Sequence, residues 1–201
     1  PEAFVALVKF VRERQAQHPN RIVRILSIPC AGGEEPYSIA MALHDAAVPR
    51  ASILIDAIDL SETALTRARR GLYTRNAFRS ADLAFRERHF TPDDACYQIK
   101  PYLRDQVNFA QGNLVTIDAA ANVGRYDVIF CRNLLIYFDE ANTASAVAKL
   151  RLMLSDEGML FAGYSEVPTF CQYGFTPMRS PGAFVLQKER RNVLRVRDSA
   201  A

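Results

Sequence analysis

Polar side chains directly follow four of the predicted strands, at the positions where α/β proteins most often place their chemistry. These residues are Glu34, Asp59, Asn113 and the pair Arg132 and Asn133. The carboxyl ends of parallel strands meet at one edge of a sheet, and ligands bind there near the switch in strand order. The pattern therefore predicts one ligand cleft assembled from four strand ends.

The turn after the first predicted strand indicates which ligands the cleft excludes. Gly32 and Gly33 let the backbone approach a ligand closely, and the next helix offers free N–H groups. A dinucleotide site has a G-x-G-x-x-G turn, whereas here Glu34 and Glu35 stand where pyrophosphate would lie. These two acids repel phosphates and favour a ligand with an ammonium group. Acids also stabilise helix N-termini through the helix dipole, so a purely structural interpretation of them stays open.

Asp59 follows the second predicted strand, where a carboxylate can accept hydrogen bonds from both hydroxyls of an adenosine ribose. Ribose recognition without room for pyrophosphate points to S-adenosylmethionine, whose methionine part carries an ammonium, a carboxylate and a sulfonium. The side-chain amides of Asn113 and Asn133 can read the adenine edge or the methionine head group. All three residues are also common in turns, which is the alternative.

Arg132 and Tyr137 are the candidates for contact with the second substrate. An arginine in a cleft can hold a carboxylate through two parallel hydrogen bonds. A tyrosine hydroxyl in the same cleft can donate one hydrogen bond to a substrate. The alternatives are an exposed arginine at a strand end and a packed aromatic ring with a single hydroxyl contact.

The composition is that of a folded protein without a strong charge bias. The chain has 201 residues, 49% hydrophobic and 23% charged, with a net charge of +3. This charge is too small to predict nucleic-acid binding, and no apolar run approaches the about 18 residues of a membrane span. The four cysteines form no C-x-x-C pair and the three histidines are scattered. We therefore expect one cytoplasmic domain with reduced thiols, no metal site and no membrane insertion.

The candidate residues must be positioned by elements that alternate between strand and helix, the pattern of a parallel α/β sheet. Strands are predicted at residues 22–29, 52–58, 107–111, 126–131, 159–164 and 183–188. Helices are predicted at residues 1–17, from near Pro36, at 61–70 with Gly71 as the stop signal, and at 139–154, closed by Gly158. Residues 72–103 show only a short strand at 97–100 and are interpreted as an insertion or small subdomain.

With these residues in view, the sequence resembles the CheR-type chemotaxis-receptor methyltransferases. That family transfers a methyl group from S-adenosylmethionine to glutamate side chains of receptors. The resemblance is carried in family order by residues 24–40, 57–73, 112–114, 126–139 and 158–166. Its most specific parts are residues 32–38 (GGEEPYS) and 131–138 (CRNLLIYF).

The resemblance implies an α/β fold, a seven-stranded Rossmann-like class I methyltransferase sheet whose last strand is antiparallel. It also implies a small antiparallel β-subdomain, at about residues 76–104, inserted before the fourth strand. The methyltransferase domain would then occupy residues 1–188, followed by a basic tail or linker at 189–201. The helical N-terminal domain of the family is expected to lie outside this sequence.

The resemblance further implies roles for individual residues. Glu34 would meet the methionine head group and Asp59 the ribose, while Arg132 and Tyr137 would lie near the transferred methyl. The rest of the cofactor pocket would be lined by Ala31, Gly32, Asn113, Leu114, Asn133 and Leu134. The expected product is S-adenosylhomocysteine, and no metal is required.

The implied substrate is the cytoplasmic domain of a methyl-accepting chemotaxis-type receptor, methylated on glutamate carboxylates by a monomeric enzyme. Some family members tether themselves to a receptor pentapeptide through a glycine-bearing loop, but residues 88–100 contain no glycine. We therefore expect tether-independent action, as in a relative specialised for surface sensing. Three alternatives stay open: a methyltransferase for another protein or a small molecule, a non-catalytic cofactor-binding module, and a nicotinamide oxidoreductase, which Glu34 and Glu35 disfavour.

Overall fold

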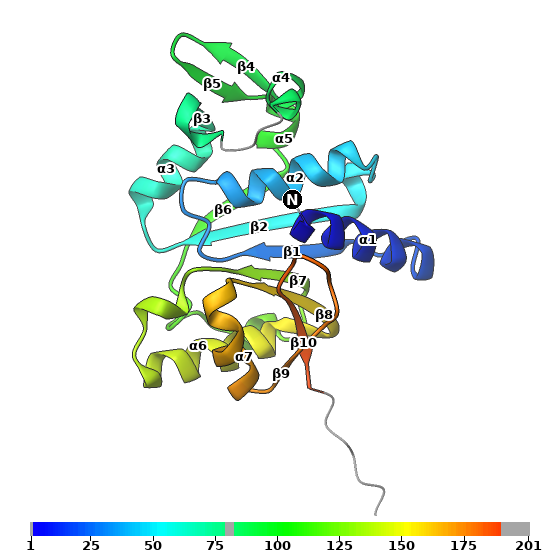
Figure 1. The fold of residues 1–201 in the computed structure, drawn as a ribbon, viewed down its shortest axis with the longest axis vertical. Helices are drawn as coiled ribbons and strands as arrows, with labels where there is room; N and C mark the ends of the chain where they lie inside the picture. Colours follow the sequence, from blue (N-terminus) through cyan, green and yellow to red (C-terminus); the bar gives the residue numbers. More distant parts are fainter. Residues whose placement is uncertain (1, 79–82, 190–201) are drawn as a thin grey trace, which may run out of the picture.

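The computed structural model describes residues 2–78 and 83–189, which form a seven-stranded sheet with flanking helices and a separate three-stranded sheet at one end (Figure 1). Residues 79–82 of the expected subdomain, and residues 190–201 of the expected tail, lie outside the described residues. Among the described residues, no helix is long and apolar enough to cross a membrane.

The large sheet has the order β6-β2-β1-β7-β8-β10-β9. Its strands are β1 (Val23–Ser27), β2 (Ile53–Asp59), β6 (Val107–Gln111), β7 (Tyr126–Cys131), β8 (Leu154–Ala162), β9 (Phe175–Pro177) and β10 (Val185–Lys188). The first five strands of this order run parallel, whereas β10 is antiparallel to both of its neighbours. The predicted seven-stranded sheet with an antiparallel last strand is confirmed. Its strand order reverses between β1 and β7, so that the carboxyl ends of these two strands form a switch point.

Helices cover both faces of this sheet, so its central strands β1 and β7 are buried at nearly every position and are mostly apolar. The helices are α1 (Glu2–Gln17), α2 (Glu34–Asp45), α3 (Glu62–Arg70), α4 (Ala84–His89), α5 (Pro101–Arg104), α6 (Glu140–Met153) and α7 (Val167–Gln172). Ile25 of β1 packs with Leu7 of α1 and Ile39 of α2. Its neighbour Leu26 packs on the other face with Leu150 of α6.

Local signals set the bounds of α3 as predicted. The Ser61 hydroxyl accepts a hydrogen bond from the Ala64 N–H, and Gly71 ends the helix in the left-handed conformation with φ of 62°.

The prediction that Gly158 closes α6 was wrong. The helix ends at Met153, β8 begins at once, and Gly158 lies in an irregular part of β8 beside Asp127. A Cβ at Gly158 would lie 2.9 Å from the Asp127 carbonyl oxygen, so this glycine serves close strand packing.

The small sheet has the antiparallel order β3-β5-β4, with β3 (Leu72–Thr74), β4 (Phe90–Asp93) and β5 (Cys96–Ile99). It starts directly after Gly71, before the expected boundary near residue 76. It also precedes β6, the third strand of the large sheet in chain order, and not the fourth as predicted.

The sequence prediction also missed α7 and β9, which are short. Pro177 in β9 is typical of an edge strand.

Candidate functional site

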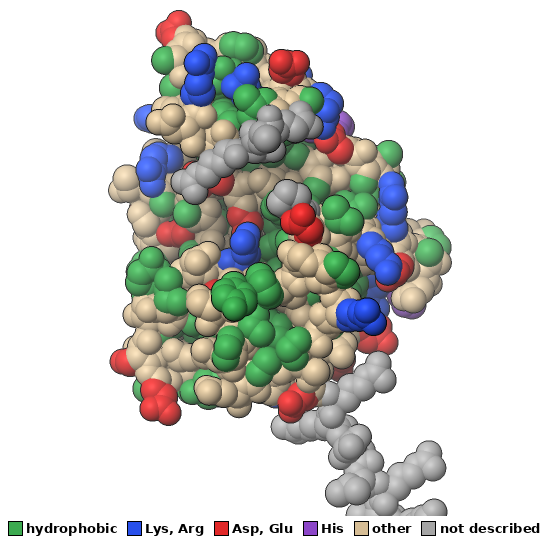
Figure 2. Space-filling model, in the orientation of Figure 1, with side chains coloured by type: hydrophobic (Ala, Val, Ile, Leu, Met, Phe, Trp, Pro, Cys, Tyr) green, Lys and Arg blue, Asp and Glu red, His purple; other side chains and the backbone are tan. Residues whose placement is uncertain are grey.

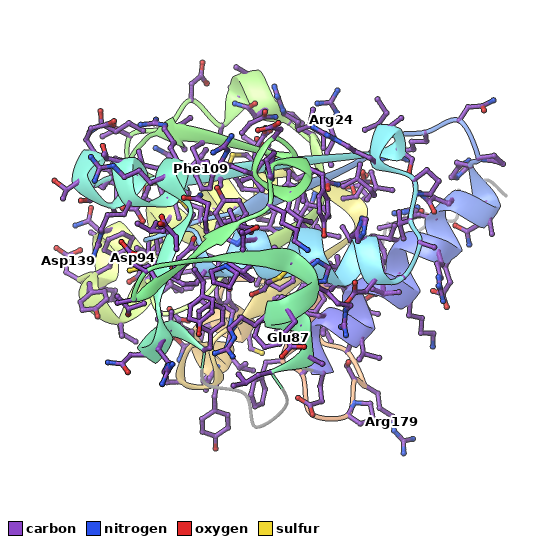
Figure 3. All side chains as sticks on the ribbon, turned by 90° about the horizontal axis from the view of Figure 1, so that it is seen from above. Arg24, Glu87, Asp94, Phe109, Asp139 and Arg179 are labelled. Carbon is purple, nitrogen blue, oxygen red and sulfur yellow. The ribbon has the colours of Figure 1, made fainter. Side chains whose placement is uncertain are left out.

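A cavity of about 420 Å³ opens at the carboxyl ends of β1, β2, β6 and β7. Four of the predicted site residues line it, namely Asp59, Asn113, Leu114 and Leu134. In Figure 3, which is seen from above, Asp139, which follows the loop after β7, lies at the left edge of the molecule, whereas Arg24, near the start of β1, lies at its upper side. The cavity wall is largely apolar with few polar groups, which is the usual make-up of a small-molecule site.

Asp59 is buried, with 8% of its surface exposed, at the end of β2. Its Oδ2 accepts a hydrogen bond from the Ala31 N–H at 2.8 Å, and its Oδ1 accepts one from the Ser61 N–H at 2.9 Å. An ionised carboxylate has about four acceptor positions, so each oxygen keeps capacity for a further hydrogen bond. Asp59 therefore ties the β1 turn to α3 and still presents acceptors on the cavity wall.

The turn after β1 is held by packing from α3 and β3. The Gly32 carbonyl accepts a hydrogen bond from the Tyr73 hydroxyl at 2.8 Å. Gly33 begins α2 with φ of 90°, and a Cβ there would lie 3.0 Å from both Ala68 Cβ and Tyr73 Oη. Only glycine meets both demands, because φ is positive and the space is filled.

The remaining cofactor candidates lie outside the cavity wall. Ala31 and Glu34 are exposed. The Glu34 carboxylate lies over Gly32, with Oε1 2.9 Å from where a Gly32 Cβ would stand. Asn133 is exposed too, with a left-handed φ of 59°. The structure thus brings Asp59, Asn113, Leu114 and Leu134 together on one cavity wall. It leaves Ala31, Glu34 and Asn133 outside this wall.

Arg132 has a partner that the sequence analysis did not assign. Its Nη1 lies 3.5 Å from Oε2 of Glu35, whose Oε1 accepts a hydrogen bond from the Ser27 hydroxyl at 2.8 Å. Burial raises the pKa of Glu35, against the opposing effects of Ser27 and Arg132. The Arg132 side chain is 44% exposed and borders a smaller cavity of about 170 Å³ with Phe161 and Phe184.

Tyr137 projects from the loop that follows β7. It ends a single 3-10 turn, Leu135–Tyr137, and is 77% exposed. It borders neither of the two cavities described above. Tyr164 and Phe184 are further exposed aromatics whose rings lie 5.1 Å apart. Figure 2 shows hydrophobic side chains gathered over the region of α7, so the surface there is more apolar than its surroundings.

The thiols next to the site are not poised for chemistry. Cys30 and Cys131 are buried and free. Burial, with a further contribution from Asp59, raises the pKa of Cys30 to about 12. Burial also raises the pKa of Cys131. Both stay protonated near neutral pH, so neither is a nucleophile. In the described ranges, no group of three or more His, Cys, Asp or Glu residues could hold a metal ion.

Sequence reasoning missed one acidic residue at this edge of the sheet, Glu166. Its side chain is 1% exposed and accepts four backbone hydrogen bonds, three of them from the loop after β7. Residues 158–166 contributed to the family resemblance, but nothing in the local pattern shows which distant N–H groups this acid would reach. Its position two residues after the strand predicted at 159–164 was the available signal.

Comparisons with known proteins show what this chain is similar to. Residues 1–180 match the family model described as CheR methyltransferase, SAM binding domain. A protein of Pseudomonas aeruginosa named "Probable biofilm formation methyltransferase WspC" is 41% identical over 189 residues, which are 94% of this chain and 45% of that protein. The chemotaxis protein methyltransferase of Escherichia coli is 30% identical over 191 residues, 92% of this chain and 64% of that protein.

Solved structures show the same fold at low sequence identity. The CurJ carbon methyltransferase superposes with a TM-score of 0.58 at 12% identity, covering 93% of this chain and 54% of that one. The chain spans about half to two thirds of the length of the two curated relatives named above.

Proposed function

The chain belongs to the CheR methyltransferase family, and from that premise we propose that it transfers the methyl group of S-adenosylmethionine to glutamate side-chain carboxylates of a chemoreceptor-like signalling protein. The observation that carries the proposal is Asp59, a buried carboxylate with spare acceptor capacity on the wall of a cavity of about 420 Å³. Acceptors for a ribose are present there, and Glu34 and Glu35 disfavour a pyrophosphate.

The residues present fit this cofactor. Asp59 would accept hydrogen bonds from the ribose hydroxyls, and Leu114, Leu134 and Asn113 on the same cavity wall would contact the adenine. Glu34, exposed at the start of α2, attracts the ammonium group of the methionine part. When bound, S-adenosylmethionine supplies a methyl group carried on a sulfonium sulfur.

The reaction needs alignment more than acid–base chemistry. The cofactor would supply its methyl group to a carboxylate oxygen of the substrate glutamate, giving a methyl ester and S-adenosylhomocysteine, in which the sulfur is a neutral thioether. A glutamate side chain with a pKa of about 4.3 is already ionised at neutral pH, so no general base is needed. Holding the two reactants in an attack geometry can supply roughly 7–11 kcal/mol of the barrier reduction.

Arg132 and Tyr137 orient the incoming carboxylate in this proposal. Arg132 is part-exposed and held by Glu35, so its guanidinium is directed before the substrate arrives. The Tyr137 hydroxyl donates a hydrogen bond near the methyl group, consistent with its exposure on the loop after β7. The exposed aromatics Tyr164 and Phe184 give the protein substrate an apolar surface to contact.

Docking without a pentapeptide tether is supported by the small sheet. Its outer strands are β3 and β4, and an added peptide strand would need free N–H groups on one of them. Pro92 removes one such group from β4, and a two-residue turn at Asp94 and Ala95 joins β4 to β5 without glycine. The WspC relative, named for biofilm formation, supports a substrate outside flagellar chemotaxis.

Two measurements test the proposal. Calorimetric titration with S-adenosylhomocysteine should show micromolar binding, while NAD should give no heat. Methyl transfer from S-adenosylmethionine with a tritiated methyl group to a receptor cytoplasmic domain should then give a label that alkali releases as methanol, because glutamate methyl esters are alkali-labile. An alkali-stable label would place the methyl on another group, and binding of NAD alone would end the methyltransferase assignment.

A further inference from the structure

The Glu166 carboxylate joins the two loops that follow β7 and β8. Oε2 accepts hydrogen bonds from the Asn133 N–H at 2.7 Å and the Gly163 N–H at 3.1 Å. Oε1 accepts hydrogen bonds from the N–H groups of Leu134 and Leu135, both at 2.8 Å. Both oxygens are therefore saturated by backbone donors in a side chain that is 1% exposed.

Backbone dipoles, and not a basic side chain, balance this buried charge among the described residues. A buried carboxylate is unfavourable unless its acceptor positions are filled, and hydrogen bonds to an ionised acceptor are stronger than neutral ones. The same hydrogen bonds also constrain the loop that donates them. Three successive N–H groups can point at one carboxylate only if the loop between β7 and the following 3-10 turn keeps its particular shape.

The loop that Glu166 holds is the one that supplies site residues. Asn133 is in the left-handed region with φ of 59°, a conformation that asparagine adopts more readily than other non-glycine residues but that is still uncommon. Leu134 lines the cavity of about 420 Å³, and the 3-10 turn that carries Tyr137 begins at Leu135. Glu166 itself borders neither cavity described above, so it acts on the site only through this backbone.

We propose that Glu166 is a positioning residue, which holds the backbone of Asn133, Leu134 and Leu135 in its ligand-binding shape before a ligand arrives. The inference rests on the proposed function in one respect, that S-adenosylmethionine or its product occupies the cavity. Glu166→Gln tests it, because the glutamine side chain has the same shape but replaces one acceptor oxygen with a donor NH2. In either orientation of the amide, two of the four backbone N–H groups then face another donor.

A matched control separates positioning from general stability. Asp127 is a second buried carboxylate, at the opposite end of β7, where it accepts hydrogen bonds from the Arg24 N–H and the Arg21 guanidinium. Asp127→Asn makes the same chemical change away from the cavity. Both variants should lower the Tm, but only Glu166→Gln should weaken S-adenosylhomocysteine binding, by about tenfold or more in Kd. Glu166→Asp keeps an acceptor-only carboxylate and should recover part of the affinity.

Gly163→Ala provides a second variant if Glu166→Gln does not fold. Gly163 has φ of −72° and ψ of 150°, which alanine adopts freely, but its Cβ would lie 2.5 Å from Glu166 Oε2. This variant should displace the carboxylate and weaken binding while Glu166 is retained. A folded Glu166→Gln or Gly163→Ala protein with wild-type affinity would overturn the inference.

Hydrogen exchange distinguishes failure of this inference from failure of the proposed function. The amides of Asn133, Leu134 and Leu135 should exchange slowly in the unliganded wild-type protein, because all three are bonded to Glu166. Unprotected exchange would refute the positioning role whatever ligand the protein takes. Slow exchange in a wild-type protein that does not bind S-adenosylhomocysteine would support the positioning of the loop and reject the ligand.

Discussion

Replacing Asp59 by alanine tests the ribose contact directly. The change removes both acceptors that face the cavity and also frees the N–H groups of Ala31 and Ser61, which Asp59 now binds. Loss of affinity alone would therefore mix a lost ligand contact with a displaced turn. The two effects can be separated by changing the ligand together with the protein.

The expected magnitude follows from the hydrogen bonds involved. A hydrogen bond to a charged group contributes about 1.5–3 kcal/mol, so two ribose hydroxyls on Asp59 represent about 3–6 kcal/mol of binding free energy. At about 1.4 kcal/mol per tenfold change, the Kd for S-adenosylhomocysteine should rise at least about 100-fold in Asp59→Ala. Loss of the two backbone hydrogen bonds should add a smaller effect on Tm.

The assay compares adenosine with 2′,3′-dideoxyadenosine in the wild-type protein and in Asp59→Ala, by calorimetry or ligand-detected NMR. The wild-type protein should strongly prefer adenosine, and the variant should bind the two ligands about equally. Asp56→Ala is the matched control, because Asp56 lies on the same strand, accepts a hydrogen bond from the Tyr126 hydroxyl at 3.0 Å and does not line the cavity. If Asp59→Ala lost the same factor for both ligands, Asp59 would act only through the turn and the ribose assignment would be refuted.

Three further predictions concern substrate alignment and pH. Tyr137→Phe should lower kcat for methyl transfer while leaving the Kd for S-adenosylhomocysteine unchanged, and an unchanged kcat would contradict the role of its hydroxyl. Glu35→Gln removes the ion pair that holds Arg132 and should raise KM for the protein substrate about fivefold. This factor corresponds to about 1 kcal/mol, the contribution of a part-exposed ion pair. An unchanged KM would contradict the role of Glu35. The His89 Nε2 atom lies 2.9 Å from Asp45 Oδ1, but burial of the ring outweighs this contact and lowers the pKa of His89. As the pH falls, the unfolded chain therefore takes up a proton on this histidine before the folded protein does. The contribution of His89 to stability is complete above pH 6.5 and is lost as pH falls through its lowered pKa, so the difference in urea midpoint between wild type and His89→Asn should shrink from pH 7.5 to pH 5. A difference independent of pH would show that His89 does not titrate in this range.

Much of the framework could be predicted because the relevant forces act over a few residues. The bounds of β7 match the predicted 126–131, since a largely apolar run marks a strand buried on both faces. The bounds of β6 also match the predicted 107–111, although β6 is an edge strand in which only Val107 is buried. Ser61 and Gly71 delimit α3 through hydrogen bonds and backbone geometry within one turn of the helix. Local patterns failed for two short elements, although each carries a fully buried side chain, Phe170 in α7 and Phe175 in β9. The three-residue strand β9 and the six-residue helix α7 are held by neighbouring elements and not by their own sequence.

Residue order along the chain was enough to predict which residues follow strands, and hence that Asp59, Asn113, Leu114 and Leu134 lie at one edge of a parallel sheet. Strands that alternate with helices along the chain pair in parallel, so their carboxyl ends meet at one edge of the sheet. Which side chains meet across that edge depends instead on the folded arrangement of the elements. Arg132 pairs with Glu35, 97 residues earlier, and Glu166 binds N–H groups 31 to 33 residues away. Such pairs depend on the order of the strands in the sheet. They also depend on the exclusion of water from the packed interior, because an unpaired charge there is costly. The spacing of residues along the chain predicts neither the strand order nor the packing.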